Sequence, residues 1–320
     1  MGTVCLFQFP RDHYDFEAIP VNGQMKRTLQ SVVHIQAAWR GYVVRRNKRA
    51  TKVQIAEARL GPFLYGDGLY PHVIKRPAVA VKAGVYAGEW NPETMHREGR
   101  GVLLFNDGSK YEGHWFKDRA NGRGRLYHAN GDVYEGEWFN DVSHGQGAFY
   151  HFAGGKCEGS WVQDHQHGFG KEVWPDGSYY EGYYQRGLKH GEGHFVWADG
   201  SWYRGQFTDN NIEGHGVYTW ANRCSYTGSW VDNKMHGKGK FTWNDGRVYE
   251  GAYSRDKREG RGVMVYPDGF RVKGVWVKGK LEGEAQETSP DGSVRTRVYV
   301  DGKSAGNSVG HSTNSSFVRH

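Results

Sequence analysis

Two hydrophobic periodicities divide the chain into a short N-terminal part and a much longer C-terminal part. Over residues 31–46, apolar residues recur at intervals of three and four positions with arginines beside them, which predicts an amphipathic helix. Beyond residue 86, short stretches alternate between apolar and polar positions and are separated by Gly-containing turn signals, as expected for β-strands joined by tight turns. The apolar stripe of the helix consists of Val32, Ile35, Trp39, Tyr42 and Val43.

The β region repeats itself with a period of 23 residues. One glycine column keeps this period after Gly88, which stands two residues out of step, and a second column runs from Gly99 to Gly283. Nine units are therefore present, and because one hairpin cannot bury a core alone, neighbouring hairpins are expected to stack edge to edge. The first column consists of Gly113, Gly136, Gly159, Gly182, Gly205, Gly228, Gly251 and Gly274.

Each unit combines the same sequence signals. Tyr-Glu-Gly-x-Trp alternates as a strand does and places Tyr134 and Trp138 of the third copy on one face. His-Gly-x-Gly follows at 144–147, and most units end in Asp-Gly or Asn-Gly, which supplies the positive φ of a hairpin turn. Asn222-Arg223 replaces that pair in one unit, which predicts a looser turn there.

The unit resembles the MORN repeat (membrane occupation and recognition nexus) through Tyr-Glu-Gly-x-Trp at 134–138 and His-Gly-x-Gly at 144–147. The resemblance covers residues 86–303 and implies an all-β fold, an elongated single-layer antiparallel sheet of stacked hairpins with a groove along one face. The first copy has a longer internal connection, and the last copy has Glu284 and Ser289 at column positions. These departures indicate capping of the array at its ends.

A column late in the unit, strongly aromatic in the C-terminal half of the array, supplies a candidate partner groove. Exposed aromatic rings are suited to anchoring a helix or an extended peptide. The same rings are equally compatible with a stacked core. The candidate groove residues are Trp174, Trp197, Trp220 and Trp243.

The predicted helix carries a calmodulin-type signal. Basic amphipathic helices are typical calmodulin targets, and Ile35-Gln36-x-x-x-Arg40-Gly41-x-x-x-Arg45 resembles a complete IQ motif. The resemblance implies that Ile35 enters an apolar cleft of calmodulin or a calmodulin-like protein, with Gln36 bonded to backbone at its rim and Gly41 permitting close approach. Arg40 and Arg45 then pair with acidic residues of the partner, and binding without calcium is expected.

The apolar anchors of this motif should dominate its affinity. Burial of Ile35 or Trp39 contributes about 1.5–3 kcal/mol each, whereas an exposed arginine pair gives at most about 1 kcal/mol. The alternative is that the helix packs against the chain's own sheet or an adjacent subunit.

The net charge of +7 is concentrated in one segment. Residues 25–60 contain nine Lys and Arg residues against Glu57 alone, so the repeats are close to neutral. This distribution argues against a nucleic-acid partner. Three scattered cysteines are typical of a reducing compartment, and the sequence shows neither an apolar run long enough to span a membrane nor a secretory signal.

Catalytic chemistry, metal sites and cofactors are not expected. His144, His167, His190 and His236 occupy one repeat column and are interpreted as structural. A column of glutamates, including Glu112, Glu135, Glu158, Glu181 and Glu250, lies on a strand face instead of forming an acid/base pair. Since about 17 residues follow the last repeat, no catalytic domain is expected there.

These observations predict five segments. They are an irregular N-terminus (1–24), the IQ helix (25–58), a linker or cap (59–85), nine repeats (86–303) and a disordered tail (304–320). We expect a non-catalytic scaffold that carries calmodulin and docks other proteins on its sheet, in the cytoplasm. The resemblance favours the axoneme of a cilium or flagellum, or another cytoskeletal assembly.

Two other functions stay open. The basic helix could tether the array to an anionic membrane, at about 1 kcal/mol for each basic residue near the surface. Family analogy alone supports a regulatory subunit of a separate lipid kinase. The sequence does not determine the oligomeric state, and a homo-oligomer is left open.

Overall fold

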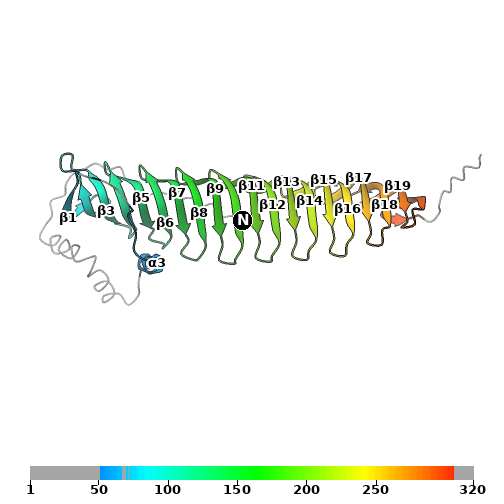
Figure 1. Ribbon diagram of the computed structural model, residues 1–320, viewed down its shortest axis with the longest axis horizontal. Helices are drawn as coiled ribbons and strands as arrows, with labels where there is room; N and C mark the ends of the chain where they lie inside the picture. The colour runs from blue at the N-terminus through cyan, green and yellow to red at the C-terminus, as the bar shows by residue number, and fades with distance from the viewer. Residues whose placement is uncertain (1–50, 67–69, 71, 306–320) are drawn as a thin grey trace, which may run out of the picture. The chain divides into compact units, whose positions relative to one another are not determined.

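The computed structural model describes residues 51–66, 70 and 72–305, and the chain divides into two compact units, residues 1–188 (unit 1) and 189–320 (unit 2). In Figure 1 the strands of each unit follow one another in chain order. The predicted N-terminus at 1–24, the predicted IQ residues and the tail beyond residue 305 lie outside the described residues.

The described part of the chain is almost entirely β-structure, with α3 (Lys52–Leu60) as the one helix among those residues. In unit 1 the strands are β1 (Ile74–Val81), β2 (Gly84–Trp90), β3 (Arg97–Phe105), β4 (Lys110–Phe116), β5 (Arg119–Tyr127), β6 (Val133–Phe139), β7 (Val142–Tyr150), β8 (Lys156–Val162), β9 (His165–Val173) and β10 (Tyr179–Gln185). From the unit boundary onward they are β11 (Leu188–Val196), β12 (Trp202–Thr208), β13 (Asn211–Thr219), β14 (Ser225–Val231), β15 (Lys234–Thr242), β16 (Val248–Ser254), β17 (Lys257–Val265), β18 (Arg271–Val277), β19 (Lys280–Thr288), β20 (Val294–Val300) and β21 (Lys303–Ser304).

Within each unit the strands pair antiparallel with their neighbours in sequence, which confirms the predicted all-β class and the stacked hairpins. Strand β6 pairs with β5 on one side and with β7 on the other, and Gly136 faces Gly124 and Gly147 in these two ladders. The same arrangement recurs in unit 2, where Gly228 of β14 faces Gly216 and Gly239.

Two kinds of turn join these strands. Two-residue turns such as Asn140-Asp141 have positive φ at both positions, as type I′ hairpins require. Their second residue also reaches the preceding repeat, since Asp141 Oδ1 accepts a hydrogen bond of 2.7 Å from the Ala120 N–H. Wherever Asp or Asn stands at this position, its side chain therefore ties the two-residue turn to the start of a strand one repeat earlier.

The other turns carry the Asp-Gly pairs, and here one expectation was wrong. Gly108 and Gly246 have φ values of 91° and 89°, as predicted for these pairs. The Asn222-Arg223 turn is equally tight, because the Arg223 N–H donates to the Trp220 carbonyl at 2.8 Å. Arg223 adopts a φ of 68° in place of glycine, so the ladder on either side imposes the turn despite the strain of a left-handed arginine.

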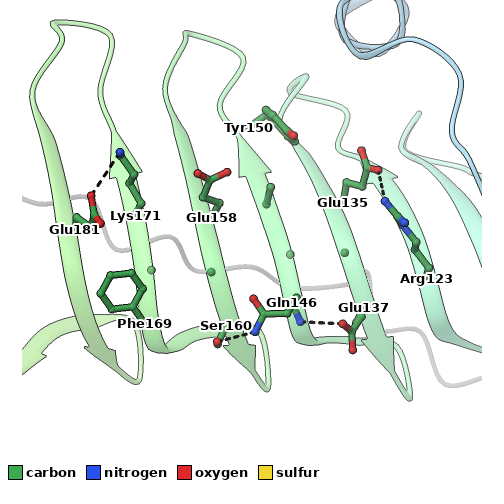
Figure 2. Close-up of a pocket in the computed structure, with 15 residues that line it drawn as sticks. Arg123, Glu135, Glu137, Gln146, Tyr150, Glu158, Ser160, Phe169, Lys171 and Glu181 are labelled. Carbon is green, nitrogen blue, oxygen red and sulfur yellow. Dashed lines mark hydrogen bonds and ion pairs between the residues drawn. The ribbon is translucent and has the colours of Figure 1, made fainter.

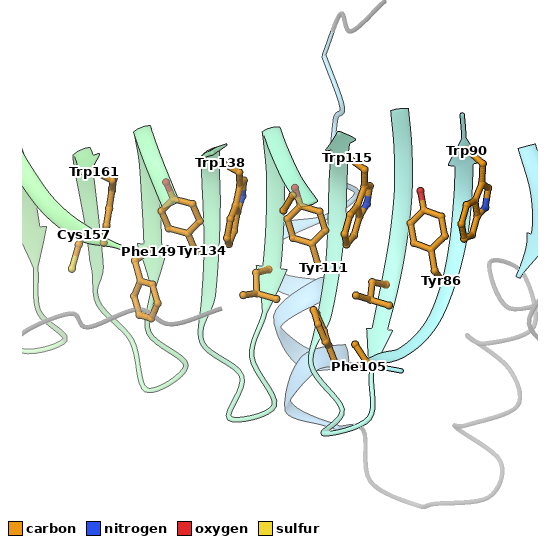
Figure 3. Close-up of a cluster of buried hydrophobic side chains, with 14 residues drawn as sticks. Tyr86, Trp90, Phe105, Tyr111, Trp115, Tyr134, Trp138, Phe149, Cys157 and Trp161 are labelled. Atoms are coloured by element: carbon orange, nitrogen blue, oxygen red, sulfur yellow. The ribbon is translucent and has the colours of Figure 1, made fainter. Parts of the chain in front are cut away.

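A ladder of tyrosine and tryptophan rings forms the core of the sheet. In Figure 3 the rings of Tyr111, Trp115, Tyr134 and Trp138 stand in one row. Tyr134 meets Trp138 of its own repeat at 5.1 Å and Trp161 of the next at 5.2 Å, both edge to face, a favoured geometry for aromatic pairs. This side of the sheet is called the aromatic face, and the side that carries Glu135 and Glu137 is called the charged face.

Glycine is required beneath these rings. A Cβ added at Gly147 would lie 2.3 Å from the hydroxyl of Tyr134 and 2.6 Å from its ring. The hydroxyl itself donates to the Glu137 carbonyl at 3.2 Å. Gly147 stands two residues after Gly145 of the second column, and the absence of a side chain there lets Tyr134 lie flat against the neighbouring backbone.

The segment before the repeats differs from the predicted boundaries. Thr51 is extended and caps α3 in a capping box with Gln54, so the Thr-x-x-Gln signal starts a helix within the stretch 25–58 that the sequence assigned to one helix. Helix α3 ends at Leu60, beyond the predicted boundary at 58. The predicted linker or cap at 59–85 includes β1, which pairs with β2 and has a register shift around Pro77.

Candidate functional site

The predicted IQ residues lie outside the described part of the chain. Ile35, Gln36, Trp39, Arg40, Gly41 and Arg45 therefore stay sequence predictions. The described residues offer three surfaces instead: the aromatic face of unit 2, the docked segment at residues 51–66 and 70, and a groove on the charged face of unit 1.

Three of the four candidate groove tryptophans lie on one ladder in unit 2. Trp197 meets Tyr218 at 5.1 Å, and Tyr218 meets Trp220 at 4.6 Å. Trp220 then meets Phe241 at 5.2 Å. Phe241 in turn meets Trp243 at 4.5 Å, so the rings form a continuous second ladder.

This second ladder is half-buried, in contrast to the Tyr-Trp core. Trp197, Trp220 and Trp243 are all partly exposed, whereas Trp230 of the same unit is 4% exposed. The rings are therefore stacked with one another and also accessible. Trp174 belongs to unit 1 and is likewise partly exposed. Docking of a partner on these tryptophans stays a prediction.

On the charged face of unit 1, helix α3 packs against the sheet. Val53 and Ala56 are buried in a cluster with Tyr127 and Val133, and Tyr150 is partly buried against it. The described end of the predicted N-terminal helix thus packs on the chain's own sheet, which was one of the alternatives for that helix.

Charged residues of the sheet hold α3 and the chain that follows it. Lys110 Nζ lies 2.7 Å from a carboxylate oxygen of Glu57. Arg125 donates to the Gly61 carbonyl at 2.8 Å and to Glu135 at 2.7 and 2.9 Å. Arg100 donates to the Gly66 carbonyl at 3.0 Å. The segment is thereby fixed at several points along its length.

The electrostatics of this docking site follow from burial. Desolvation of Arg125 acts to lower its pKa, but hydrogen bonds to Tyr127 and Glu135 raise it above the ordinary value. Burial, together with the nearby charge of Arg100, lowers the pKa of His114. Tyr65 and Tyr70 cover the His114 ring, with centroids 5.8 and 5.6 Å away.

Beyond the docked segment, the charged face of unit 1 forms an open groove of about 890 Å³. Figure 2 shows the side chains that line it, with carboxylates on the alternate strands β6, β8 and β10. Glu135, Glu158 and Glu181 belong to the glutamate column that the sequence placed on a strand face, and Tyr150 lies at one side. Sequence reasoning identified this column but not the groove, because a column alone does not indicate what covers it.

Three groove carboxylates, Glu135, Glu158 and Glu181, have a basic neighbour. Lys171 Nζ lies 3.5 Å from Glu181, and both side chains are more than 40% exposed. Lys156 pairs with Glu158, and this hydrogen bond raises the pKa of Lys156. Such exposed pairs contribute about 1 kcal/mol or less, so a competing cation can replace them.

The described residues show no other chemical centre. No group of three or more His, Cys, Asp or Glu side chains in the described ranges is arranged to hold a metal ion. Helix α3, the one helix of the described residues, is too short to cross a membrane.

Comparison with known proteins identifies the family to which this repetitive chain belongs. The MORN repeat model matches residues 96–110, 111–133, 134–155, 157–179, 180–202, 203–225, 226–246, 249–271 and 273–294. The chain belongs to the MORN-repeat family. The nine predicted copies are confirmed, and residues 29–47 match the IQ calmodulin-binding motif, as the sequence indicated. Both families are non-catalytic binding modules.

Similarity to other proteins is weak outside these two families. No curated protein sequence matches the chain. The TCP10 domain of Danio rerio CPAP in complex with a peptide of Danio rerio STIL is 13% identical, with a TM-score of 0.39 over 68% of this chain and 96% of that chain. The SAS-4 (dCPAP) TCP domain of Drosophila melanogaster, in complex with a proline-rich motif of Ana2, is 11% identical, with a TM-score of 0.31 over 62% and 90%. These values are too low to carry an argument about fold or partners.

Proposed function

We propose that this MORN-repeat protein is a non-catalytic adaptor that carries calmodulin or a calmodulin-like protein on its IQ motif and docks further proteins on its sheet. The observation that carries this proposal is the IQ match at residues 29–47, four residues before a helix that is fixed to unit 1. A calmodulin-type partner bound there is held next to the repeats, because α3 anchors the chain at Thr51.

The IQ interaction is tested by calmodulin pull-down of the full chain with and without calcium. Ile35→Asp places a charge in the apolar cleft and should weaken binding at least tenfold, since burial of Ile35 is worth about 1.5–3 kcal/mol. Ala37→Asp adds the same charge on the opposite side of the predicted helix and should bind nearly as the unaltered chain does. Absence of binding in both calcium conditions would reject this part of the proposal.

The second ladder of unit 2 supports the docking of other proteins. Half-exposed aromatic rings are common anchors at interfaces, and Trp197, Trp220 and Trp243 present three of them in successive repeats. Proximity labelling with the full chain and with Trp220→Ala should identify partners that require the ladder. Identical labelling by both chains would remove the ladder from the proposal.

Assembly on an axoneme or another cytoskeletal structure is part of the proposal and rests on the resemblance to ciliary MORN proteins. Imaging of the tagged protein in ciliated cells tests this assembly. Absence of the protein from both the cilium and the cytoskeleton would contradict it.

A membrane tether is the second candidate function. Residues 25–50 contain seven basic residues and no acidic one, which favours binding to an anionic membrane. Liposome flotation at low and high salt decides between the two. Lipid binding that disappears when residues 25–50 are deleted supports the tether, and no binding by the full chain excludes it.

A further inference from the structure

The charged face of unit 1 is strongly acidic where the docked segment ends. From β6 to β10, residues 133–185 contain eight Asp and Glu residues and two basic ones, Lys156 and Lys171. Four carboxylates of this stretch, Glu135, Glu137, Glu158 and Glu181, line the groove of about 890 Å³. The groove is therefore suited to a basic chain segment.

Unit 2 lacks this property on the equivalent face. The column that holds Glu112, Glu135, Glu158 and Glu181 in unit 1 continues as Arg204, Thr227, Glu250 and Lys273. Since these positions are equivalent in the repeat, the acidity of unit 1 is not needed to form the sheet. It is a local feature of the surface next to α3.

The chain itself supplies a basic segment at this place. Residues 25–50 contain seven Lys and Arg residues and no acidic one. Their C-terminal end is fixed at the groove, because Lys52 Nζ lies 5.2 Å from the centre of the Phe152 ring and Val53 belongs to the cluster against which Tyr150 packs. Tyr150 is also a lining residue of the groove.

We propose that residues 40–50 occupy the acidic groove of unit 1 and that this contact competes with calmodulin-type binding. The reach is sufficient: six extended residues span about 20 Å from Thr51 to Arg45, whereas four neighbouring strands, such as β7 to β10, span about 14 Å. The spacing also matches. Arg46 and Arg49 are three residues or about 10 Å apart when extended, and Glu158 and Glu181 lie two strands or about 10 Å apart.

The competition follows from shared residues and rests on the proposed calmodulin function. Arg40 and Arg45 belong to the IQ motif, which calmodulin grips as a helix, and the groove would hold the same arginines in an extended segment. One segment cannot adopt both conformations at once. The groove therefore lowers the apparent affinity for calmodulin by the fraction of chains in which it is occupied.

Disulfide trapping in the full chain tests the contact without calmodulin. Cysteine is placed at Val44 and at Ser160, whose side chain lines the groove, in a Cys5→Ser background that keeps the buried Cys157 and Cys224. The matched control pairs Val44→Cys with Ser229→Cys, the equivalent position three repeats later in unit 2. We expect the cross-linked monomer to form at least fivefold faster with Ser160→Cys than with Ser229→Cys. Equal rates, or cross-linked dimers alone, would overturn the intramolecular contact.

Calmodulin titration of the full chain tests the competition. The double variant Glu158→Lys and Glu181→Lys reverses two exposed charges of the groove. It should increase the apparent calmodulin affinity about fivefold. Glu250→Lys makes the same change at the equivalent exposed position of unit 2 and should leave the affinity unchanged. An unchanged affinity in the double variant would overturn the competition. If the unaltered chain binds no calmodulin, the proposed function fails instead, and the trapping experiment still decides whether the groove is occupied.

Discussion

Units 1 and 2 are built from the same repeat and present different surfaces. In both, tyrosine and tryptophan rings meet edge to face in the core, as Tyr134 and Trp138 do in unit 1 and Tyr226 and Trp230 do in unit 2, both at 5.1 Å. Unit 1 carries an acidic groove and a docked helix on its charged face. Unit 2 carries a half-exposed aromatic ladder on its aromatic face.

The difference shows which positions of the repeat build the sheet and which remain available for binding. Leu126 in unit 1 is fully buried on the aromatic face, whereas Tyr218, four repeats later in the same column, is partly exposed and stacks with Trp197 and Trp220. The fold tolerates either residue, because the core rings and the glycines beneath them are kept. Function is therefore expected to reside in the columns that vary.

The largest effect should come from breaking a feature that the two units share. Gly147→Ala drives a methyl group into Tyr134, and Gly239→Ala does the same to Tyr226, where the nearest atom lies 2.3 Å from the added Cβ in each case. Such overpacking should cost each unit about 3 kcal/mol of its unfolding free energy. Hydrogen exchange resolved by strand measures it, with the loss confined to the unit that carries the substitution and its neighbouring repeats.

Gly170→Ala is the matched control for this prediction. Cys157 replaces the tyrosine of that repeat, and the nearest atom to an added Cβ at Gly170 is the Glu158 carbonyl oxygen at 3.0 Å. Gly170→Ala should therefore lower the unfolding free energy by only about 1 kcal/mol. Equal losses at Gly147 and Gly170 would show that the tyrosine ring is not the reason for glycine in this column.

A smaller effect, of opposite sign, is expected in unit 2. Arg223 has a φ of 68° in a turn where other repeats place glycine. Arg223→Gly should raise the free energy of unfolding by about 1 kcal/mol, because relief of the left-handed strain exceeds the entropy that glycine adds to the unfolded chain. Thermal unfolding measures the gain.

The reverse change in the next turn completes this test. Gly246 has a φ of 89° and its added Cβ would meet no atom closer than 3.4 Å. Gly246→Arg should therefore lower the free energy of unfolding by about 1 kcal/mol through backbone strain alone. A stabilised Gly246→Arg or a destabilised Arg223→Gly would contradict this account of the turns.

Much of the fold could be predicted from the sequence, because a 23-residue period specifies strand, turn and stacking nine times over. Tyr134 and Trp138 share a face, and Gly108 has a positive φ, as their patterns indicated. The turn at Arg223 was mispredicted because local propensity was overruled by the ladders on both sides.

The surfaces were harder to predict than the core. The capping signal Thr51-x-x-Gln54 was present in the sequence, but it lay within a longer stretch interpreted as one helix. Docking of α3 through Lys110 and Arg125 depends on contacts 53 and 64 residues apart in sequence. Periodicity carries no information about such contacts. For the same reason the glutamate column could be identified, while the groove next to the docked segment could not.

The smallest effect is predicted for a substitution that gives a turn of unit 1 the residue found at the equivalent position in unit 2. Asp141 accepts a hydrogen bond from the Ala120 N–H, and Asn210 and Asn233 accept the equivalent bonds in unit 2 through amide oxygens. Burial raises the pKa of Asp141, although its backbone hydrogen bond and nearby arginines partly oppose the shift. A carboxyl with a raised folded pKa favours the folded state at low pH, and this contribution is lost as the pH rises through that pKa.

Asp141→Asn keeps the acceptor and removes the buried charge. Relative to the unaltered chain, the variant should gain stability as the pH rises from about 4, the ordinary Asp pKa, towards neutrality. The gain should be below about 1 kcal/mol, because the turn is only half-buried. Urea unfolding at pH 4 and pH 7 measures it. If Asp141→Asn is less stable than the unaltered chain at pH 7, the negative charge itself strengthens the bond to Ala120, and the aspartates of unit 1 are then not equivalent to the asparagines of unit 2.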